Sequence, residues 1–485
     1  MRGALPLDKR VINVKNQKLT DDEFFEERRR GLNLWPTGKE IDLEDGIAFQ
    51  KSLPSHKNAV NRLMWARKNR KVLTQPRGGI CLVDEYMKRL KLFQEEGKAD
   101  IVTAQNDSYT RNERYDLCEK AWNESKRLGK STLNGCPWAN WGVKESRRLI
   151  GAIDIPLDAR GGVDAFTVEV ALNAGATCFL GGFLNHLSYN PNLPPEVVLR
   201  KQQQVNRLQG YYTEHGVPIV SDSHAFSGPS FPVHSLETAQ VVIDALLEIE
   251  QGLKYVILRD RQTFSLIQDI AKARAVKELA EEYVKKSGHE DVELFLGYED
   301  WVAAFPRDRA QASAMVAMGA MAAHYSGAQN IMIKSLDEGV GLPTNEAQVF
   351  SLRETKQVLN ILPNQEFPEN REVEDEKHML LKEARLIIEK VFELGDGDLA
   401  VGCVKALDIG VLDHPFSSNR YIAGKVLPTR DAHGMVRYLD CGNLPFTKEI
   451  IEFHREKVNE RKRVEKLEKD YQLMLNDVAA FTGDL

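Results

Sequence analysis

The 485-residue sequence has few cysteines, and none of them forms a recognisable pair. There is no C-x-x-C motif, and no histidine stands near a cysteine at metal-ligand spacing. The six cysteines are Cys81, Cys118, Cys136, Cys178, Cys403 and Cys441. This pattern argues against a disulfide-stapled secreted domain and against a structural zinc site, and it indicates free thiols in a reducing cytoplasm.

Long apolar runs and a surplus of either charge are also missing. The most apolar run, residues 312–323, is roughly half of what a membrane span needs. The apolar part of the amino terminus is too short for a signal peptide. Acidic and basic residues are interspersed, with a formal net charge of −6. We therefore expect a cytoplasmic protein whose partners are neither nucleic acid nor membrane.

No G-x-G-x-x-G motif follows the first strand pattern, so a dinucleotide-binding sheet is not indicated. From about residue 70 to about residue 345, short apolar strand patterns alternate with longer amphipathic helix patterns, as in parallel β/α folds. The predicted strands are 72–76, 101–105, 130–133, 154–158, 177–180, 217–221, 254–258, 292–297 and 330–334. A closed eight-stranded barrel has one strand fewer, and 130–133 is the candidate for the extra segment.

Polar residues at strand ends favour a barrel over an open sheet, because the carboxyl end of a TIM barrel carries the site. These residues are Arg77, Asn106, Asn134, Arg160, Asp222 and Lys334. We predict a (β/α)8 TIM barrel over residues 70–345, an N-terminal helical extension over 1–69, and a C-terminal α+β extension, helical and irregular, over 346–485. The extensions contain predicted helices from the Thr20–Glu23 capping box, over 376–394 and over 447–475.

Three arginines follow strand patterns. Arg77 lies in Gln75-Pro76-Arg77-Gly78-Gly79, and Arg111 and Arg160 come after the patterns at 101–105 and 154–158. A guanidinium group is always charged and binds carboxylates in a bidentate manner, so the three arginines could clamp a carboxylate or a phosphate. Alternatively, each arginine pairs with a structural acid such as Asp84 or Asp158. The sequence pattern leaves both interpretations open.

Two further motifs are ambiguous. Asp222-Ser223-His224 resembles the start of the cobalamin-binding D-x-H-x-x-G motif, but Ser227 stands where the glycine belongs. A hydrogen-bonded histidine at the barrel mouth is therefore favoured over cobalt ligation by His224. Lys334 and Glu338 lie in a glycine-containing loop that suits recognition of sugar hydroxyls, or that holds a simple salt bridge.

A set of ordered motifs makes the sequence similar to a known family over nearly its whole length. The motifs are Trp35-Pro36-Thr37-Gly38-Lys39-Glu40, Gln75-Pro76-Arg77, Tyr109-Thr110-Arg111 with Arg114-Tyr115, Leu133-Asn134-Gly135, Ser188-Tyr189-Asn190, Ile267-Gln268-Asp269-Ile270-Ala271, Phe305-Pro306, the Lys334 loop and Gly397-Asp398-Leu399-Ala400-Val401-Gly402. With them the chain resembles the epsilon, or large catalytic, subunits of glutamate mutase, which is also called methylaspartate mutase.

The resemblance implies an adenosylcobalamin-dependent isomerase with a TIM-barrel large subunit. In that family the cobalt–carbon bond breaks homolytically, the deoxyadenosyl radical takes a hydrogen atom from glutamate, and the glycyl fragment migrates to give 3-methylaspartate. A separate small (sigma) subunit carries the cobalt-ligating histidine and caps the barrel, so no metal ligand is expected in this chain. The expected assembly is a heterotetramer that contains two large subunits.

The resemblance also implies roles for individual residues. The substrate carboxylates would be held by a claw of Arg77, Arg111 and Arg160, and Tyr189 would contact the substrate. The cofactor contacts would be Gly79, Asn134, Phe305, Lys334, Glu338 and Leu342.

The sequence departs from the family pattern where the substrate's amino group would bind. Gly161 replaces a histidine after the third claw arginine, and the second substrate tyrosine falls near Leu193. No Asp or Glu occurs from 170 to 195, where the family has a glutamate that faces the ammonium group. The replacement partners would be Asn185, His186 or Asp222. Otherwise the substrate is another carboxylic acid, including a non-amino one, or the barrel is a non-catalytic partner of a cobalamin-binding subunit.

We predict that Arg111→Lys sharply raises KM or lowers kcat, because lysine cannot reproduce the bidentate geometry of a guanidinium group. Steady-state kinetics on glutamate, with the small subunit and adenosylcobalamin present, measure this. Unchanged kinetics would refute a role for Arg111 in the claw.

Overall fold

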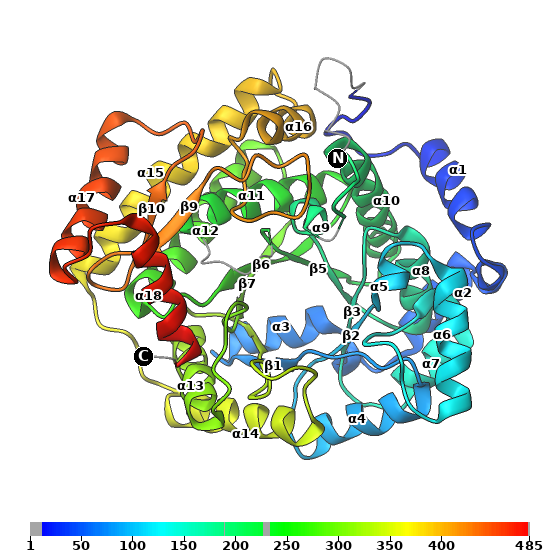
Figure 1. Cartoon of the computed structure of the whole chain (residues 1–485). Coiled ribbons are helices and arrows are strands. Elements are labelled where there is room, and N and C mark those ends of the chain that lie inside the picture. Colours follow the sequence, from blue (N-terminus) through cyan, green and yellow to red (C-terminus); the bar gives the residue numbers. More distant parts are fainter. Residues whose placement is uncertain (1–11, 189, 227–232, 484–485) are drawn as a thin grey trace.

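Eight parallel strands form a barrel at the centre of the computed structural model, which describes residues 12–188, 190–226 and 233–483 (Figure 1). The strands are β1 (Leu73–Pro76), β2 (Val102–Gln105), β3 (Leu157–Arg160), β4 (Cys178–Leu180), β5 (Val220–Ser223), β6 (Tyr255–Arg261), β7 (Glu293–Glu299) and β8 (Asn330–Ile333). Each strand from β2 to β8 pairs with the next in sequence, and β8 pairs with β1. Hydrogen bonds from Ile101 to Thr74 (3.2 Å) and from Gln105 to Gly78 (2.9 Å) bridge β1 and β2. The predicted TIM barrel is confirmed.

The structure shows which of the nine predicted strands is not part of the barrel. Residues 130–133 form no strand, and only a single bridge joins Asn106 to Cys136 nearby. Two other strands begin three residues later than predicted, at Leu157 and Val220. Pro156 and Pro218 precede them, and proline has no N–H group to donate to the ladder.

Helices surround the barrel in sequence order and cover its outer face (Figure 1). They are α4 (Val83–Glu95), α6 (Tyr115–Leu128), α7 (Trp138–Gly151), α8 (Ala165–Ala174), α10 (Pro195–Glu214), α11 (His234–Glu250), α12 (Leu266–Lys286), α13 (Arg309–Tyr325) and α14 (Asn345–Ile361). Two short helices, α5 (Ser108–Arg111) and α9 (Phe183–Leu187), follow β2 and β4 inside this ring (Figure 1). Across the described ranges, no helix is both long enough and apolar enough to cross a membrane.

The N-terminal segment packs on the barrel through α1 (Asp21–Leu32), α2 (Leu43–Ser52) and α3 (Ala59–Lys68), with short 3₁₀ turns at Pro36–Glu40 and Ser55–Lys57. The predicted capping box is confirmed, because the Glu23 amide donates to Thr20 Oγ1 (3.3 Å) and the Thr20 amide donates to Glu23 Oε2 (3.0 Å).

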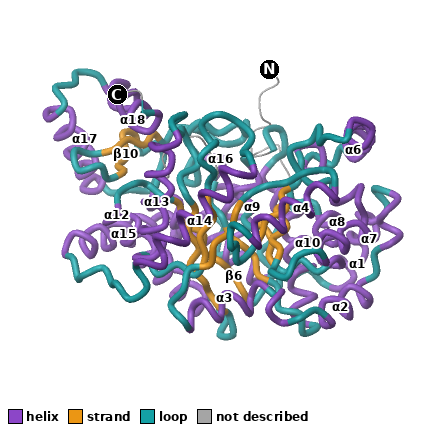
Figure 2. The backbone as a smooth tube through the Cα atoms, turned by 90° about the horizontal axis from the view of Figure 1, so that it is seen from below, coloured by secondary structure: helices purple, strands orange, loops and turns teal. Residues whose placement is uncertain are grey.

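Helix α3 closes one end of the barrel, and Figure 2 shows it beneath the strands. Its buried face, which includes Val60 and Leu63, packs in one apolar cluster with side chains from the amino-terminal parts of the strands, among them Leu73, Val220 and Phe295. The strand-end arginines lie at the opposite end. The apolar cluster therefore fills the amino-terminal end of the barrel, away from these arginines.

The C-terminal segment contains α15 (Arg371–Leu394), α16 (Leu399–Ile409), β9 (Leu427–Arg430), β10 (Val436–Asp440), α17 (Lys448–Val464) and α18 (Asp470–Thr482). The prediction of one helix over 447–475 is wrong. The chain turns at Lys466, which has a positive φ of 56°. Arg461 then donates to Asp477 of α18 at 2.8 Å, so a tertiary ion pair joins the two helices.

The domain boundaries at 69/70 and 345/346 remain predictions.

We expect Leu63→Ala to lower the free energy of unfolding by about 2–5 kcal/mol, because it leaves a cavity under the barrel. Leu63 is fully buried, whereas Met64 on the same helix is 38% exposed. Met64→Ala is therefore the control, with an expected change within about 0.5 kcal/mol. Chemical denaturation followed by circular dichroism compares the two variants. Equal effects would contradict a sealing role for α3.

Candidate active site at the carboxyl end of the barrel

The three strand-end arginines meet in one small cavity. Arg77 directly follows β1, Arg111 ends α5 after β2, and Arg160 is the last residue of β3. All three line a cavity of about 20 Å³ within the barrel mouth, which we call the claw cavity. Its other lining residues are Gln105, Gly161, Leu180, Asn185, His224 and Glu299. Parallel strands that end on one side of the barrel bring these distant residues together.

A buried ionic network fixes Arg160. Its Nε donates to Asp158 Oδ2 at 2.7 Å, and its Nη2 donates to Asp222. Arg259 donates two further hydrogen bonds to Asp222, at 2.9 and 2.7 Å. Burial opposes charge on Asp222, but Arg259 and Arg160 outweigh it and hold the pKa of this carboxyl group well below its usual range. Arg160 thus pairs with structural acids, as the alternative interpretation of the sequence has it, and it also lines the cavity, while its role in a clamp stays a prediction.

Glu299 is a cavity residue that the sequence interpretation missed. It is the last residue of β7, is 3% exposed, and its Oε1 accepts a hydrogen bond from Arg77 Nη1 at 3.2 Å. Burial would raise the pKa of Glu299, but Arg77 and His224 lower it to about 2, so the group is ionised at neutral pH. The sequence contains one signal that could have identified Glu299 as a site residue: it is a charged residue just past the end of the predicted strand 292–297.

His224 lies between Arg160 and Glu299. Its Nε2 is 3.2 Å from both terminal nitrogens of Arg160, and its Nδ1 is 3.7 Å from Glu299 Oε2. Burial lowers its pKa. The imidazole thus has close polar neighbours at both ring nitrogens. This is the hydrogen-bonded position at the barrel mouth that the sequence favoured.

The three suggested ammonium partners occupy different places. Asn185 lines the claw cavity, is 1% exposed, and its Oδ1 has no hydrogen-bond partner. His186 is fully buried outside the cavity lining, with Nε2 at 3.4 Å from the Gly161 carbonyl. Asp222 is fully buried against two guanidinium groups and also does not line the cavity. Tyr189 falls outside the described residues.

Steric crowding excludes an acidic side chain at two positions of the run 179–187. A Cβ atom on Gly181 would lie 2.2 Å from Ser221 Oγ and 2.3 Å from Glu248 Oε1. Gly182 has a left-handed φ of +85°, and a Cβ there would lie 2.4 Å from the His224 carbonyl oxygen. Neither position can hold a glutamate without movement of the surrounding residues.

A larger cavity of about 390 Å³, which we call the mouth cavity, shares Arg77, Gln105 and Arg111 with the claw cavity. Five of the six predicted cofactor contacts line it: Gly79, Asn134, Lys334, Glu338 and Leu342. Lys334 Nζ pairs with Glu338 Oε1 at 2.5 Å. Phe305 does not line the cavity. Its carbonyl oxygen would lie 2.5 Å from a Cβ on Gly339, so the Phe305 backbone packs closely against the Lys334 loop.

The donor set of the mouth cavity suits a large ligand that carries both hydroxyl groups and apolar surface. Both side-chain polar atoms of Asn106, which also lines this cavity, are buried without a partner. Leu342 is 78% exposed at the rim, and the Lys334–Glu338 pair offers a donor and an acceptor for adjacent hydroxyls. Within the described part of the chain, no three His, Cys, Asp or Glu side chains gather as a metal site would require.

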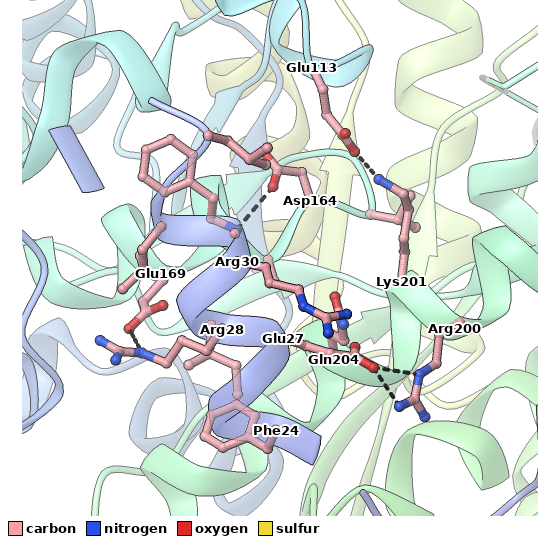
Figure 3. A pocket seen from close by; sticks show the side chains of 17 residues that line it. Phe24, Glu27, Arg28, Arg30, Glu113, Asp164, Glu169, Arg200, Lys201 and Gln204 are labelled. Atoms are coloured by element: carbon pink, nitrogen blue, oxygen red, sulfur yellow. Dashed lines mark hydrogen bonds and ion pairs between the residues drawn. The ribbon is translucent and has the colours of Figure 1, made fainter. Parts of the chain in front are cut away.

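A third cavity, of about 340 Å³, lies outside the barrel between α1 and α10 (Figure 3). Ion pairs cross it, from Arg28 to Glu169 at 2.6 Å and from Lys201 to Glu113. It contains no predicted site residue. Glu113 lies two residues after Arg111, so the Lys201–Glu113 pair ties the loop that carries Arg111 to α10.

The family model described as Methylaspartate mutase E chain (MutE) matches residues 53–485. Among curated relatives, the glutamate mutase epsilon subunit of Treponema denticola is 37% identical over 472 residues, which cover 97% of each chain. The protein of the same name from Desulfitobacterium hafniense is 37% identical and covers 97% of this chain and 98% of its own. The one from Escherichia coli O157:H7 is 38% identical over 477 residues, with the same coverage.

The buried His186 imidazole predicts a pH dependence of stability. Burial lowers the pKa of His186 from 6.5 to about 4. The unfolded chain therefore binds a proton between these values that the folded chain does not, so stability falls as the pH drops from about 6.5 to about 4. A shift of this size corresponds to about 3 kcal/mol at the low end of the window.

We expect His186→Gln to flatten this dependence, measured as the thermal midpoint from pH 7.5 to pH 4.5. At pH 7.5 the imidazole is neutral in the folded chain, so a difference there reports packing alone. A wild-type slope retained in the variant would show that His186 does not titrate in this way.

Proposed function

The chain belongs to the methylaspartate mutase E chain family, and from this premise we propose that it is the catalytic large subunit of an adenosylcobalamin-dependent mutase. The proposed reaction interconverts L-glutamate and threo-3-methyl-L-aspartate by a radical mechanism. The names of the relatives support the coarser assignment, a mutase and hence an isomerase. The observation that supports the substrate is the convergence of Arg77, Arg111 and Arg160 on one cavity.

The claw arginines would bind the two carboxylates of the substrate. Each guanidinium group offers paired N–H donors in a plane, which match a carboxylate in two hydrogen bonds and restrict its rotation. Arg160 is held by Asp158 and Asp222, so its side chain is ordered before the substrate arrives. Ordering the side chains in advance reduces the entropy lost on binding.

The mouth cavity would hold the cofactor next to the substrate, because the two cavities share Arg77 and Arg111. Lys334 and Glu338 would bind the adenosyl ribose, and Gly79, Asn134 and Leu342 would contact the cobalamin. When bound, adenosylcobalamin supplies the radical that starts the reaction. A substrate in the claw cavity would lie against the bound cofactor, which would shield a radical from water and from side reactions.

A small cobalamin-binding subunit would supply the cobalt ligand and cover the mouth, in a heterotetramer with two large subunits. We propose a cytoplasmic location because all six cysteines are unpaired.

The second candidate function is the same radical chemistry on another carboxylic acid, and the absence of an acidic residue from 170 to 195 favours it. A non-catalytic role is disfavoured by the intact claw.

We predict that the full chain, reconstituted with a small cobalamin-binding subunit and adenosylcobalamin, converts L-glutamate to 3-methylaspartate. Proton NMR follows the new methyl signal, and electron paramagnetic resonance detects the substrate-dependent radical. Omission of the small subunit is the control and abolishes both signals. Radical formation with a non-amino dicarboxylate but not with glutamate would favour the second candidate.

A further inference from the structure

We propose that Glu299, together with Asn185, binds the ammonium group of the substrate and makes this barrel selective for amino dicarboxylates. The inference rests on the proposed function, because it assigns the part of that site which the family pattern leaves without a partner. The family's glutamate has no counterpart in 170–195, and Gly181 and Gly182 have no space for one. A carboxylate partner for the ammonium group would therefore come from another strand.

Glu299 is the acidic residue in the lining of the claw cavity. It reaches the cavity from β7, on the far side of the barrel from the run 179–187. A carboxylate has about four acceptor positions. Its Oε1 accepts from Arg77 at 3.2 Å, and its Oε2 has His224 Nδ1 at 3.7 Å, beyond hydrogen-bond length. Acceptor positions therefore remain for an ammonium group.

Asn185 supplies an independent observation. Its side chain lines the same cavity, is 1% exposed, and its Oδ1 accepts no hydrogen bond. A buried amide oxygen without a donor costs free energy, and a donor from a ligand in the cavity would remove this cost. An ammonium group carries three donors and can satisfy Asn185 Oδ1 and a Glu299 oxygen together.

The lining of the cavity matches an amino dicarboxylate group by group. Three guanidinium groups face the position of two carboxylates, and one carboxylate faces the position of one ammonium. A dicarboxylate without an amino group would place no cation beside Glu299. It would leave the buried Asn185 oxygen unsatisfied and would bring further negative charge close to Glu299.

The other candidates fit this role less well. Asp222 already has hydrogen bonds from Arg160 and Arg259, and it lies outside the cavity lining. His186 also lies outside the lining, with its Nε2 directed to the Gly161 carbonyl. Glu338 lines the mouth cavity and pairs with Lys334. Glu299 combines a charge with direct access to the claw cavity.

The test is calorimetric binding of L-glutamate and of glutarate, which lacks the amino group, to the full chain and to Glu299→Gln. The wild-type chain should bind glutamate at least about 10-fold more tightly than glutarate. Glu299→Gln should weaken glutamate binding by about 100-fold, in line with the loss of one partner of a buried charge pair. Glutarate binding should be retained or become tighter, because the variant loses the negative charge that opposes it, and this binding also shows that the claw is folded.

Two further variants sharpen the test. Glu299→Asp keeps the charge and should retain part of the preference for glutamate. Glu346→Gln removes an exposed carboxylate from the first turn of α14, outside every cavity described above, and should leave both affinities unchanged. Asn185→Ala should weaken glutamate binding more than glutarate binding.

Several outcomes would overturn the proposal: equal losses for both ligands in Glu299→Gln, an unchanged preference, or no binding of either ligand to the wild-type chain at millimolar concentration. Failure of the proposed function is a separate result. If the reconstituted enzyme turns over glutamate while Glu299→Gln keeps its preference, only this inference fails. If glutamate is not turned over but the preference for it depends on Glu299, only the proposed reaction fails.

Discussion

Pairing of buried charges at the carboxyl end of the barrel is the constraint on which the rest of the site depends. A guanidinium group cannot lose its charge, so Arg160 and Arg259 can be buried only with carboxylates beside them. Asp222 is hydrogen-bonded to both, and Asp158 completes the environment of Arg160. These acids belong to β3 and β5, which lie on either side of β4, so the network also fixes how the ends of these strands lie relative to one another.

The barrel geometry places this network and the binding site at one end of the barrel. Helix α3 seals the amino end with apolar side chains, and the polar residues gather at the other end. The claw cavity lies innermost, and the mouth cavity opens above it through the shared Arg77 and Arg111. A small polar substrate and a much larger ligand can therefore lie side by side, in contact with the residues that line both cavities.

Most of the barrel could be predicted because its signals are local. The alternation of strand and helix patterns and the three strand-end arginines can be read residue by residue, and the structure confirms the barrel and brings the arginines together. The errors arose where local patterns compete with distant contacts. The helical pattern over 447–475 is continuous, yet the ion pair between Arg461 and Asp477 folds it into two helices. Strands β3 and β5 begin later than predicted because Pro156 and Pro218 have no N–H group to donate to a neighbouring strand.

By itself, the sequence determined which residue types stand at the strand ends, and that no acidic side chain lies between 170 and 195. Only the tertiary structure decided that Glu299 faces the same cavity as Arg77 and Arg111. These residues are far apart along the chain, and no local pattern encodes which strands meet across a barrel. Closure of the sheet by pairing of β1 with β8 makes β7 a near neighbour of β1, and that geometry brings the carboxylate to the claw.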